Sequence, residues 1–250
     1  MKTLYMKIDK EDISKYVLFS GDPFRVETVA KMMTDVKHIG FHREFNTYTG
    51  YYKGVRITVT STGIGSPSAA IAMEEMFEKG MEVGVRMGTV MGLKDDLLGK
   101  FIIPKASIRR EGTTKTYVES SYPAVADIEL LSAMNKAVVE NNHEYVNGIN
   151  CTLDGFYSEM KESKLSKMMH RNIDNTFNDL KNMNVSGIDM ESSVILTLGN
   201  LMGIKTCVVS MTTVLENLKE VLVGDARTQS EIDLCKVALD GIVKYDKGEY

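Results

Sequence analysis

The sequence predicts one α/β domain in which helices wrap a mostly parallel sheet. Short runs rich in Val, Ile, Met and Thr alternate along the chain with amphipathic helical segments, as in folds built from strand–helix–strand units. The most apolar run, residues 81–92 (MEVGVRMGTVMG), has the profile of a strand buried on both faces. No linker, repeat or low-complexity tract interrupts the 250 residues, so we expect residues 1–250 to form a single domain.

The first part of the chain is expected to hold three strands and two helices. Residues 17–20 are a short strand, followed by a Gly-Asp-Pro turn and the helical segment FRVETVAKMM. Residues 45–52 and 55–60 form a hairpin joined at Lys53-Gly54. The segment STGIG then leads into an amphipathic helix that ends at Gly80.

The rest of the chain continues the alternation. The spacing of apolar residues predicts strands at 81–92, 100–107, 146–152 and 206–212, and helices at 127–141, 164–181, after Asp189, and at 229–245. Gly63-x-Gly65 is a poor match to a dinucleotide fingerprint, because Ser68 occupies the third glycine position and the next strand does not end in an acidic residue. We therefore expect no organic cofactor.

Composition excludes several classes of protein. The formal net charge of −4 does not suggest a nucleic-acid-binding surface, and no apolar run approaches the roughly 18 residues of a membrane span. The first residues, MKTLYMKIDKED, lack the apolar core of a secretory signal, so we expect none. Three widely separated cysteines argue against a disulfide framework, and the four histidines have no zinc-site spacing. We expect a cytoplasmic protein with buried, reduced thiols.

Arg86 is the most informative single residue of the apolar strand. A buried guanidinium has to be neutralised, because an uncompensated buried charge costs several kcal/mol, on the order of 3–5. Either a carboxylate of the protein or an anionic ligand can do this, and the residues around Arg86 leave both possibilities open. Thr89 offers a hydroxyl donor three residues later, and Gly88 leaves room for close approach. Arg25, in the first turn of a helix, opposes the helix dipole unless an anion binds there.

Six ordered motifs resemble a known family. They are GDPFRV (21–26), HREF (42–45), STGIGSPSAAIAMEE (61–75), VRMGT (85–89), YPAVAD (122–127) and DMESS (189–193). Together they resemble the nucleoside phosphorylases, and most of all the uridine phosphorylase branch. The resemblance runs from about Tyr5 to the last predicted helix, and it implies a mixed, mostly parallel, twisted sheet or distorted barrel flanked by helices.

The resemblance also implies a reaction and a site. Nucleoside and inorganic phosphate, the co-substrate, would give a free base and a pentose 1-phosphate in a homo-oligomer, with a dimer as the minimum and a hexamer favoured. It assigns phosphate to Gly21, Arg25, Arg86, Thr89 and, from the neighbouring subunit, Arg43. It assigns ribose to Met190, Glu191 and the position of Tyr5, and the base to Phe156, with Arg25, Arg86 and Glu191 as the catalytic groups. Some uridine phosphorylases hold a potassium ion between subunits at positions that match Glu44, Ile64 and Ser68.

The chemistry explains why these residue types belong together. Cleavage of an N-glycosidic bond passes through an oxocarbenium-like state, which the negative charge of phosphate stabilises. Guanidiniums and a hydroxyl hold a phosphate dianion by charge-assisted hydrogen bonds. A carboxylate such as Glu191 fixes the pentose hydroxyls, so that both reactants are held in line.

The part of the family motif that recognises uracil does not match. Met160 stands at the position of a Gln and Glu162 at the position of an Arg, and neither replacement can make the same hydrogen bonds to a pyrimidine edge. Val90 and Met91 replace small residues, and Tyr5 replaces a histidine. A shifted register of this segment would instead bring Lys161 or Lys164 into the pocket.

The purine branch is not matched either, since its Ser-Asp pair corresponds to Ser210-Met211. The base-binding half of the site is therefore atypical, and we expect uridine to be a poor substrate. Three functions remain: an active phosphorylase, a nucleosidase that uses water, and a non-catalytic homologue that binds nucleoside or phosphate. The three arginines argue against the nucleosidase, and the missing base contacts keep the non-catalytic homologue open.

Overall fold

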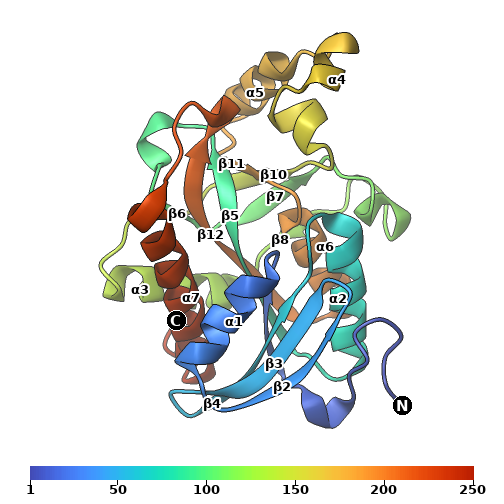
Figure 1. Cartoon of the computed structure of the whole chain (residues 1–250), viewed down its shortest axis with the longest axis vertical. Coiled ribbons are helices and arrows are strands. Elements are labelled where there is room, and N and C mark those ends of the chain that lie inside the picture. Colours follow the sequence, from blue (N-terminus) through green and yellow to red (C-terminus); the bar gives the residue numbers. More distant parts are fainter.

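In the computed structural model, which describes residues Met1–Tyr250, twelve strands join into one mixed sheet (Figure 1). The strands are β1 (Tyr16–Ser20), β2 (Thr34–His42), β3 (Phe45–Tyr52), β4 (Val55–Ser61), β5 (Val83–Gly92), β6 (Phe101–Ile102), β7 (Ala106–Arg109), β8 (Ala124–Val125), β9 (Tyr145–Val146), β10 (Ile149–Thr152), β11 (Gly187–Asp189) and β12 (Lys205–Leu215). The helices are α1 (Pro23–Met32), α2 (Ser66–Glu78), α3 (Ile128–Glu140), α4 (Lys164–Met168), α5 (Ile173–Asn182), α6 (Ser192–Met202) and α7 (Gly224–Asp246). The predicted α/β fold with a mixed, twisted sheet flanked by helices is confirmed.

Strand β5 is the centre of the sheet. The main strand order is β2-β3-β4-β1-β5-β11-β10-β7-β8, and β12 pairs with the other edge of β5. The pairings of β5 with β1 and β12 are parallel, whereas its short pairing with β11 is antiparallel. Nine of the ten β5 residues are buried, as the apolar sequence predicted. Most side chains of β5 are therefore enclosed by neighbouring strands and helices.

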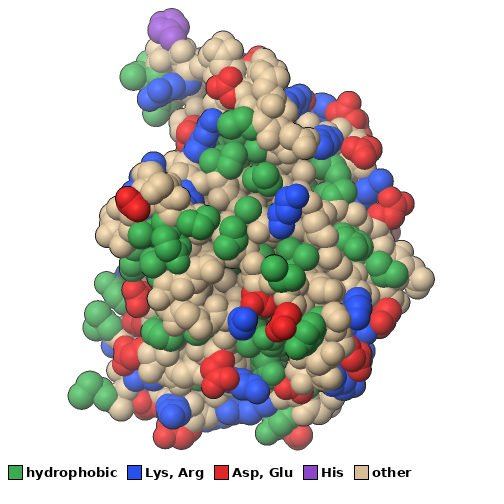
Figure 2. Space-filling model, turned by 180° about the vertical axis from the view of Figure 1, so that it is seen from behind, with side chains coloured by type: hydrophobic (Ala, Val, Ile, Leu, Met, Phe, Trp, Pro, Cys, Tyr) green, Lys and Arg blue, Asp and Glu red, His purple; other side chains and the backbone are tan.

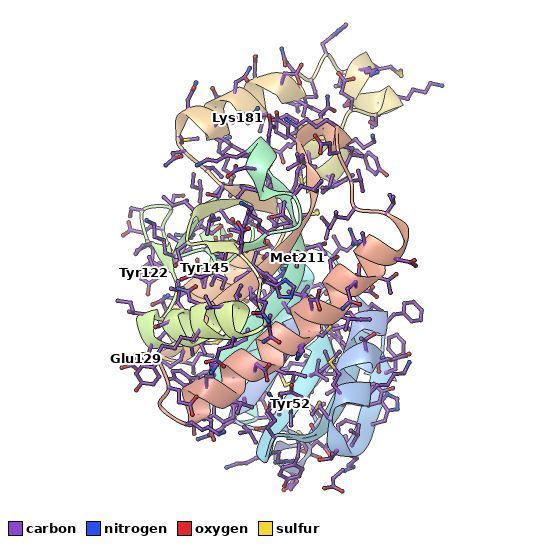
Figure 3. The ribbon with its side chains drawn as sticks, turned by 90° about the vertical axis from the view of Figure 1, so that its left-hand side faces the viewer. Tyr52, Tyr122, Glu129, Tyr145, Lys181 and Met211 are labelled. Atoms are coloured by element: carbon purple, nitrogen blue, oxygen red, sulfur yellow. The ribbon has the colours of Figure 1, made fainter.

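Two helical layers cover the sheet. On one side α7 packs against α1 and α3, and Figure 3 shows the long α7 crossing this side beside α3, which carries Glu129. On the other side α2 packs against α6. Successive β1 residues point to opposite layers, since Leu18 belongs to the core under α7 while Val17 and Phe19 belong to the core under α2 and α6. A third core lies under α5, at the end of the molecule that carries α4 (Figure 1).

Most predicted elements are present, and the differences have local causes. The hairpin of β3 and β4 has the predicted register around Lys53-Gly54, and Lys53 adopts the left-handed φ of 48° that such a tight turn requires. The predicted strand 100–107 divides into β6 and β7, with Pro104 between them. The predicted helix 164–181 divides into α4 and α5 near His170, whose φ is 52°. Strand β2 was not predicted, because no residue in it is buried and it has no alternating apolar pattern.

Three features of the structure concern membrane spans, surface charge and the cysteines. No helix combines the length and apolarity needed to cross a membrane. On the face shown in Figure 2, lysine and arginine side chains are interspersed with acidic ones and form no continuous basic patch. The three cysteines are free and buried, as predicted. No group of three or more His, Cys, Asp or Glu side chains is arranged to hold a metal ion.

Candidate active site

The main cavity, about 700 Å³, opens beyond the carboxyl ends of β1 and β4 and extends along β5 to β11. This is where ligands bind in open α/β sheets. Its lining residues are Gly21, Asp22, Pro23, Arg25, Gly63, Ile64, Arg86, Gly88, Thr89, Val90, Met91, Phe156, Met160, Ile188, Asp189, Met190, Glu191 and Val214. Ten of the residues that the sequence proposed for phosphate, ribose or base are therefore brought together from four separate segments of the chain.

Arg86 lies at the centre of the cavity and is almost fully buried. Its Nη2 donates to Oε2 of Glu191 in a short, buried ion pair. Its Nη1 lies 3.9 Å from Oδ2 of Asp189, beyond hydrogen-bonding distance. Nε and Nη1 make no hydrogen bond within the protein. The guanidinium is thus neutralised by a carboxylate and still has two buried donors to offer to an anion.

Glu191 is held at the junction between β11 and α6. Its Oε1 accepts a 2.6 Å hydrogen bond from the backbone N–H of Gly65, and Oε2 receives Arg86. Burial raises the pKa of the Glu191 carboxyl above its ordinary value, and the positive charge of Arg86 opposes this rise. The positive charge of Arg86 therefore favours the charged form of this carboxyl.

Asp189 has a different task from Glu191, although both stand in the DMESS motif. Both of its carboxylate oxygens accept from the backbone N–H of Ser192, at 3.2 and 3.0 Å, and the Thr152 hydroxyl donates to Oδ1 at 2.9 Å. These bonds satisfy donors at the start of α6 and tie it to β10. Asp189 thereby fixes the turn that points Glu191 into the cavity. The motif alone predicted no role in the site for Asp189.

Arg25 approaches the same region from α1. Asp22 caps this helix by accepting from the backbone N–H of Phe24 at 2.9 Å, with Pro23 in the first turn. The Arg25 guanidinium is buried; its Nη2 lies 3.6 Å from Oε1 of Glu231 on α7, and its Nε has no partner. Gly21 lines the cavity just before the helix, where backbone N–H groups and the helix dipole favour an anion.

Gly88 makes room for Arg86 within β5. A Cβ atom at position 88 would lie 2.0 Å from Nη1 of Arg86, so only glycine lets the guanidinium fold over its own strand. Thr89, the next residue, also lines the cavity. The sequence had suggested that Gly88 allows a ligand to approach, and the structure shows that it accommodates the arginine itself.

The far end of the cavity is an apolar wall, formed by Met91, Phe156, Met160, Ile188, Met190 and Val214. Phe156 and Met160 begin and end a π-helical turn, in which the backbone N–H of Lys161 bonds to the carbonyl of Phe156 at 2.9 Å. Val90 lines the cavity as well and packs against Leu97 and Ile102. No side chain of the apolar wall carries a hydrogen-bond donor.

Glu162 does not lie in the cavity, which corrects its proposed place beside the base. The π-helical turn buries Met160 and ends at Lys161, so Glu162 emerges at the surface before α4. Its carboxylate binds Nζ of Lys167 at 3.0 Å, and its side chain is 49% exposed. Neither Lys161 nor Lys164, the alternatives under a shifted register, lines the cavity.

Tyr5 and Arg43 also lie outside the cavity of their own chain. The Arg43 guanidinium stands 5.4 Å from the centre of the Tyr5 ring, and Arg43 is exposed at the corner between β2 and β3 with a φ of 56°. The backbone N–H groups of Tyr5 and Met6 bond to the buried Glu75 carboxylate at 2.7 and 2.8 Å. The two residues proposed to act across a subunit interface therefore lie together, with Arg43 exposed and Tyr5 partly buried.

Strand β12 contributes Val214 to the cavity rather than Met211, the residue that the sequence had compared with a purine-type acid. Met211 is buried in the core beneath α3 and α7 (Figure 3), whereas Val214 packs against the core under α5. The alternation of Cys207, Val209 and Met211, all in that core, could have revealed this from sequence. The expectation that β12 supplies no acid to protonate the departing base is unchanged, because Val214 is not an acid either.

The proposed potassium ligands are only partly assembled in one chain. The Ser68 hydroxyl donates to Oε1 of Glu44 at 2.8 Å, while Ile64 is 79% exposed. One carboxylate, one hydroxyl and backbone carbonyls are suitable oxygen donors for a hard cation, but a single chain supplies too few of them to enclose one.

Comparison with known proteins adds the family. The model of the phosphorylase superfamily matches residues 15–242. The chain belongs to this superfamily. Within it, the chain is 40% identical to uridine phosphorylase of Thermococcus kodakarensis over 195 residues, which cover 78% of this chain and 70% of the relative. It is 30% identical to guanosine phosphorylase of Halorubrum lacusprofundi over 205 residues, covering 82% and 80%. The structure of uridine phosphorylase from Vibrio fischeri superposes with a TM-score of 0.84 at 27% identity, covering 97% of this chain and 98% of that one.

Proposed function

We propose that this protein is a nucleoside phosphorylase of the uridine phosphorylase type, with an atypical base pocket. The observation that supports this most directly is the division of one cavity into two ends. Two buried guanidiniums with unpartnered donors, a hydroxyl and a helix N-terminus form the polar end, and the apolar wall forms the other. An anion and an aromatic base fit these two ends, with a pentose between them. Uridine phosphorylases and a guanosine phosphorylase are among its relatives.

In this proposal, phosphate binds between Arg86, Arg25, Thr89 and the N–H of Gly21. The free Nε and Nη1 donors of Arg86 and the free Nε of Arg25, all buried, supply charge-assisted hydrogen bonds. A phosphate oxygen attacks C1′ while the bond from C1′ to the base nitrogen breaks. The negative charge of phosphate stabilises the developing oxocarbenium character of the pentose.

Glu191 is proposed to hold the pentose. Each of its carboxylate oxygens accepts one hydrogen bond within the protein and retains a lone pair for a sugar hydroxyl. Because Arg86 contacts both Glu191 and the proposed phosphate site, the same guanidinium aligns the two reactants. Met190, the residue between Asp189 and Glu191, packs against the sugar.

We further propose that the working unit is a homo-oligomer in which Arg43 and Tyr5 act on the site of a neighbouring subunit. The exposure of Arg43 and the absence of both residues from the lining of their own chain's cavity support this arrangement. A dimer is the minimum and a hexamer the favoured size. A potassium ion is proposed where Glu44, Ser68 and the carbonyl of Ile64 meet the same groups of a second subunit. Three unpaired thiols fit the reducing cytoplasm.

The apolar wall favours one alternative, a homologue that binds nucleoside or phosphate without turnover. One assay separates the functions: nucleosides are incubated with and without inorganic phosphate, and free base is measured by chromatography. We expect base release only with phosphate, together with pentose 1-phosphate. Release without phosphate would indicate a nucleosidase, and no release from any nucleoside would indicate the non-catalytic homologue.

A further inference from the structure

The apolar wall raises the question of how the base departs. When the glycosidic bond of a neutral nucleoside breaks, the bonding electrons pass to the base, which leaves as an anion unless it is protonated or hydrogen-bonded. General acids contribute about 10²–10⁴-fold to rates of this kind. The side chains of Met91, Phe156, Met160, Ile188 and Val214 can donate no proton.

The carboxyl groups of the cavity cannot replace the missing donor. Asp189 accepts from the backbone and hydroxyl of Ser192, and Glu191 accepts from the backbone of Gly65 and from Arg86. All of these bonds require the carboxylate to be the acceptor. Asp22 likewise accepts from the start of α1, beside the proposed phosphate site. The hydroxyl of Thr89 is assigned to phosphate in the proposed function.

We propose that the preferred substrates are nucleosides whose base already carries a positive charge on its ring, such as N-ribosylated pyridiniums or purine nucleosides alkylated on the imidazole ring. This inference rests on the proposed function. In the step, a phosphate oxygen forms a bond to C1′, and the bond from C1′ to the ring nitrogen breaks. Its electron pair neutralises the ring cation, and the base leaves as a neutral molecule. No proton is transferred, so an apolar wall suffices.

Two features of the cavity favour a cationic base before it reacts. The charged side chains that line the cavity are three carboxylates (Asp22, Asp189, Glu191) and two guanidiniums (Arg25, Arg86), and bound phosphate adds further negative charge. The aromatic ring of Phe156 and the thioethers of the apolar wall are polarisable surfaces, and an aromatic face attracts a cation. As the charge disappears in the transition state, the departing neutral base matches the apolar wall better than the bound cation does.

The test compares matched pairs with the unmodified protein and inorganic phosphate. N7-methylguanosine is compared with guanosine, and nicotinamide riboside with its neutral dihydropyridine form. Base release is followed by chromatography and ribose 1-phosphate by phosphorus NMR, with phosphate-free reactions subtracted. We expect kcat/KM to be at least about 100-fold higher for the cationic member of each pair. Equal or faster reaction of the neutral members would overturn this inference and leave the proposed function standing. Absence of phosphate-dependent release from all four, and from uridine, would overturn the proposed function itself.

A variant tests whether the apolar wall is the cause. Met160→Gln places an amide donor in the wall, and it should raise kcat/KM for guanosine and uridine by about tenfold more than for N7-methylguanosine. The ratio of kcat/KM for N7-methylguanosine to kcat/KM for guanosine should fall accordingly. Met169→Gln is the matched control, because Met169 is 64% exposed and outside the cavity, and it should leave the ratio unchanged. An unchanged ratio in folded Met160→Gln would contradict the proposed role of the wall.

Discussion

Arg86 of β5 and Glu191 at the start of α6, 105 residues apart in the chain, form one buried ion pair in the middle of the cavity. The sequence left open whether a carboxylate or an anionic ligand neutralises Arg86. The structure shows the carboxylate, and it also shows two arginine donors without a partner in the protein. A single guanidinium can therefore serve both the fold and the ligand.

Arg86→Ala should weaken phosphate binding. A hydrogen bond to a charged group contributes about 1.5–3 kcal/mol, so the affinity measured by calorimetry should fall roughly ten- to hundredfold. Arg171→Ala, which removes an exposed arginine outside the cavity, serves as the control and should bind phosphate normally. Unchanged affinity in folded Arg86→Ala would remove Arg86 from the phosphate site.

The same variant should make stability more sensitive to pH. Arg86 opposes the burial that raises the pKa of Glu191, so its loss lets the folded-state pKa rise further above the ordinary value of 4.5. A carboxyl with a raised folded-state pKa contributes stability while protonated, and that contribution is lost as pH rises through the folded-state value. Urea unfolding measures this effect. The free energy of unfolding of Arg86→Ala should fall further below that of the unmodified protein as pH increases from about 4.5 to about 7.5. Adding Glu191→Gln should abolish this pH dependence. A difference in unfolding free energy that became smaller as pH rose would contradict the role of Arg86 in favouring the charged form of Glu191.

Gly88→Ala should impair phosphate binding through Arg86. The new Cβ would lie 2.0 Å from Nη1, so the guanidinium has to move away from Glu191. We expect a loss of phosphate affinity of about tenfold or more, comparable to that of Arg86→Ala. Gly112→Ala is the matched control, since its nearest contact would be an ordinary 3.5 Å from Oδ2 of Asp154. Equal phosphate affinities in the two glycine variants would disprove the steric argument.

Glu231→Gln should tighten phosphate binding. The Glu231 carboxylate lies 3.6 Å from Arg25 and accepts from Arg227 at 2.6 Å, so its negative charge competes with phosphate for Arg25. Removing that charge should raise phosphate affinity by a few fold, about 0.5–1 kcal/mol. Glu249→Gln, near the end of the chain, should have no effect. Weaker binding in Glu231→Gln would mean that this carboxylate mainly orients Arg25.

Co-expression can test whether Arg43 acts in a neighbouring subunit. Arg43→Ala and Arg25→Ala should each be inactive alone, because every site then lacks one arginine. In a mixed dimer, one site combines an intact Arg25 with the intact Arg43 of the other subunit, so random pairing should restore about a quarter of full activity. Absence of recovery in isolated mixed dimers would indicate that the shared-site arrangement is wrong.

The sequence predicted the regular elements of the fold better than the irregular ones. Buried strands and amphipathic helices carry a periodic apolar pattern, so β5, the hairpin and α3 were found close to their observed bounds. Strand β2 has no buried residue, and its few apolar side chains do not alternate regularly with polar ones. Motif residues such as Arg25 and Glu191 line one cavity, although they are far apart in the sequence.

The base end was harder to predict because its geometry depends on irregular backbone. A π-helical turn sends Glu162 to the surface two residues after burying Met160, which residue spacing alone cannot show. The pairing of β12 with β5 shifts register between Thr212 and Val214, so comparison by position selected Met211 and missed Val214. Neither the sequence nor the structure of one chain can place Arg43 in the cavity, since its proposed site belongs to a neighbouring subunit.

The three buried cysteines can be used to detect local unfolding, because a thiol reacts only after the core around it becomes exposed. Burial raises the pKa of Cys151, Cys207 and Cys235 to about 12, so each remains a protonated and unreactive thiol near neutral pH. Cys207 and Cys235 share the core under α7, while Cys151 belongs to the separate core under α5. Alkylation in dilute urea, followed by peptide mass spectrometry, would thus time the exposure of each core separately. Modification of Cys151 ahead of the other two would identify the α5 end as a unit that unfolds on its own.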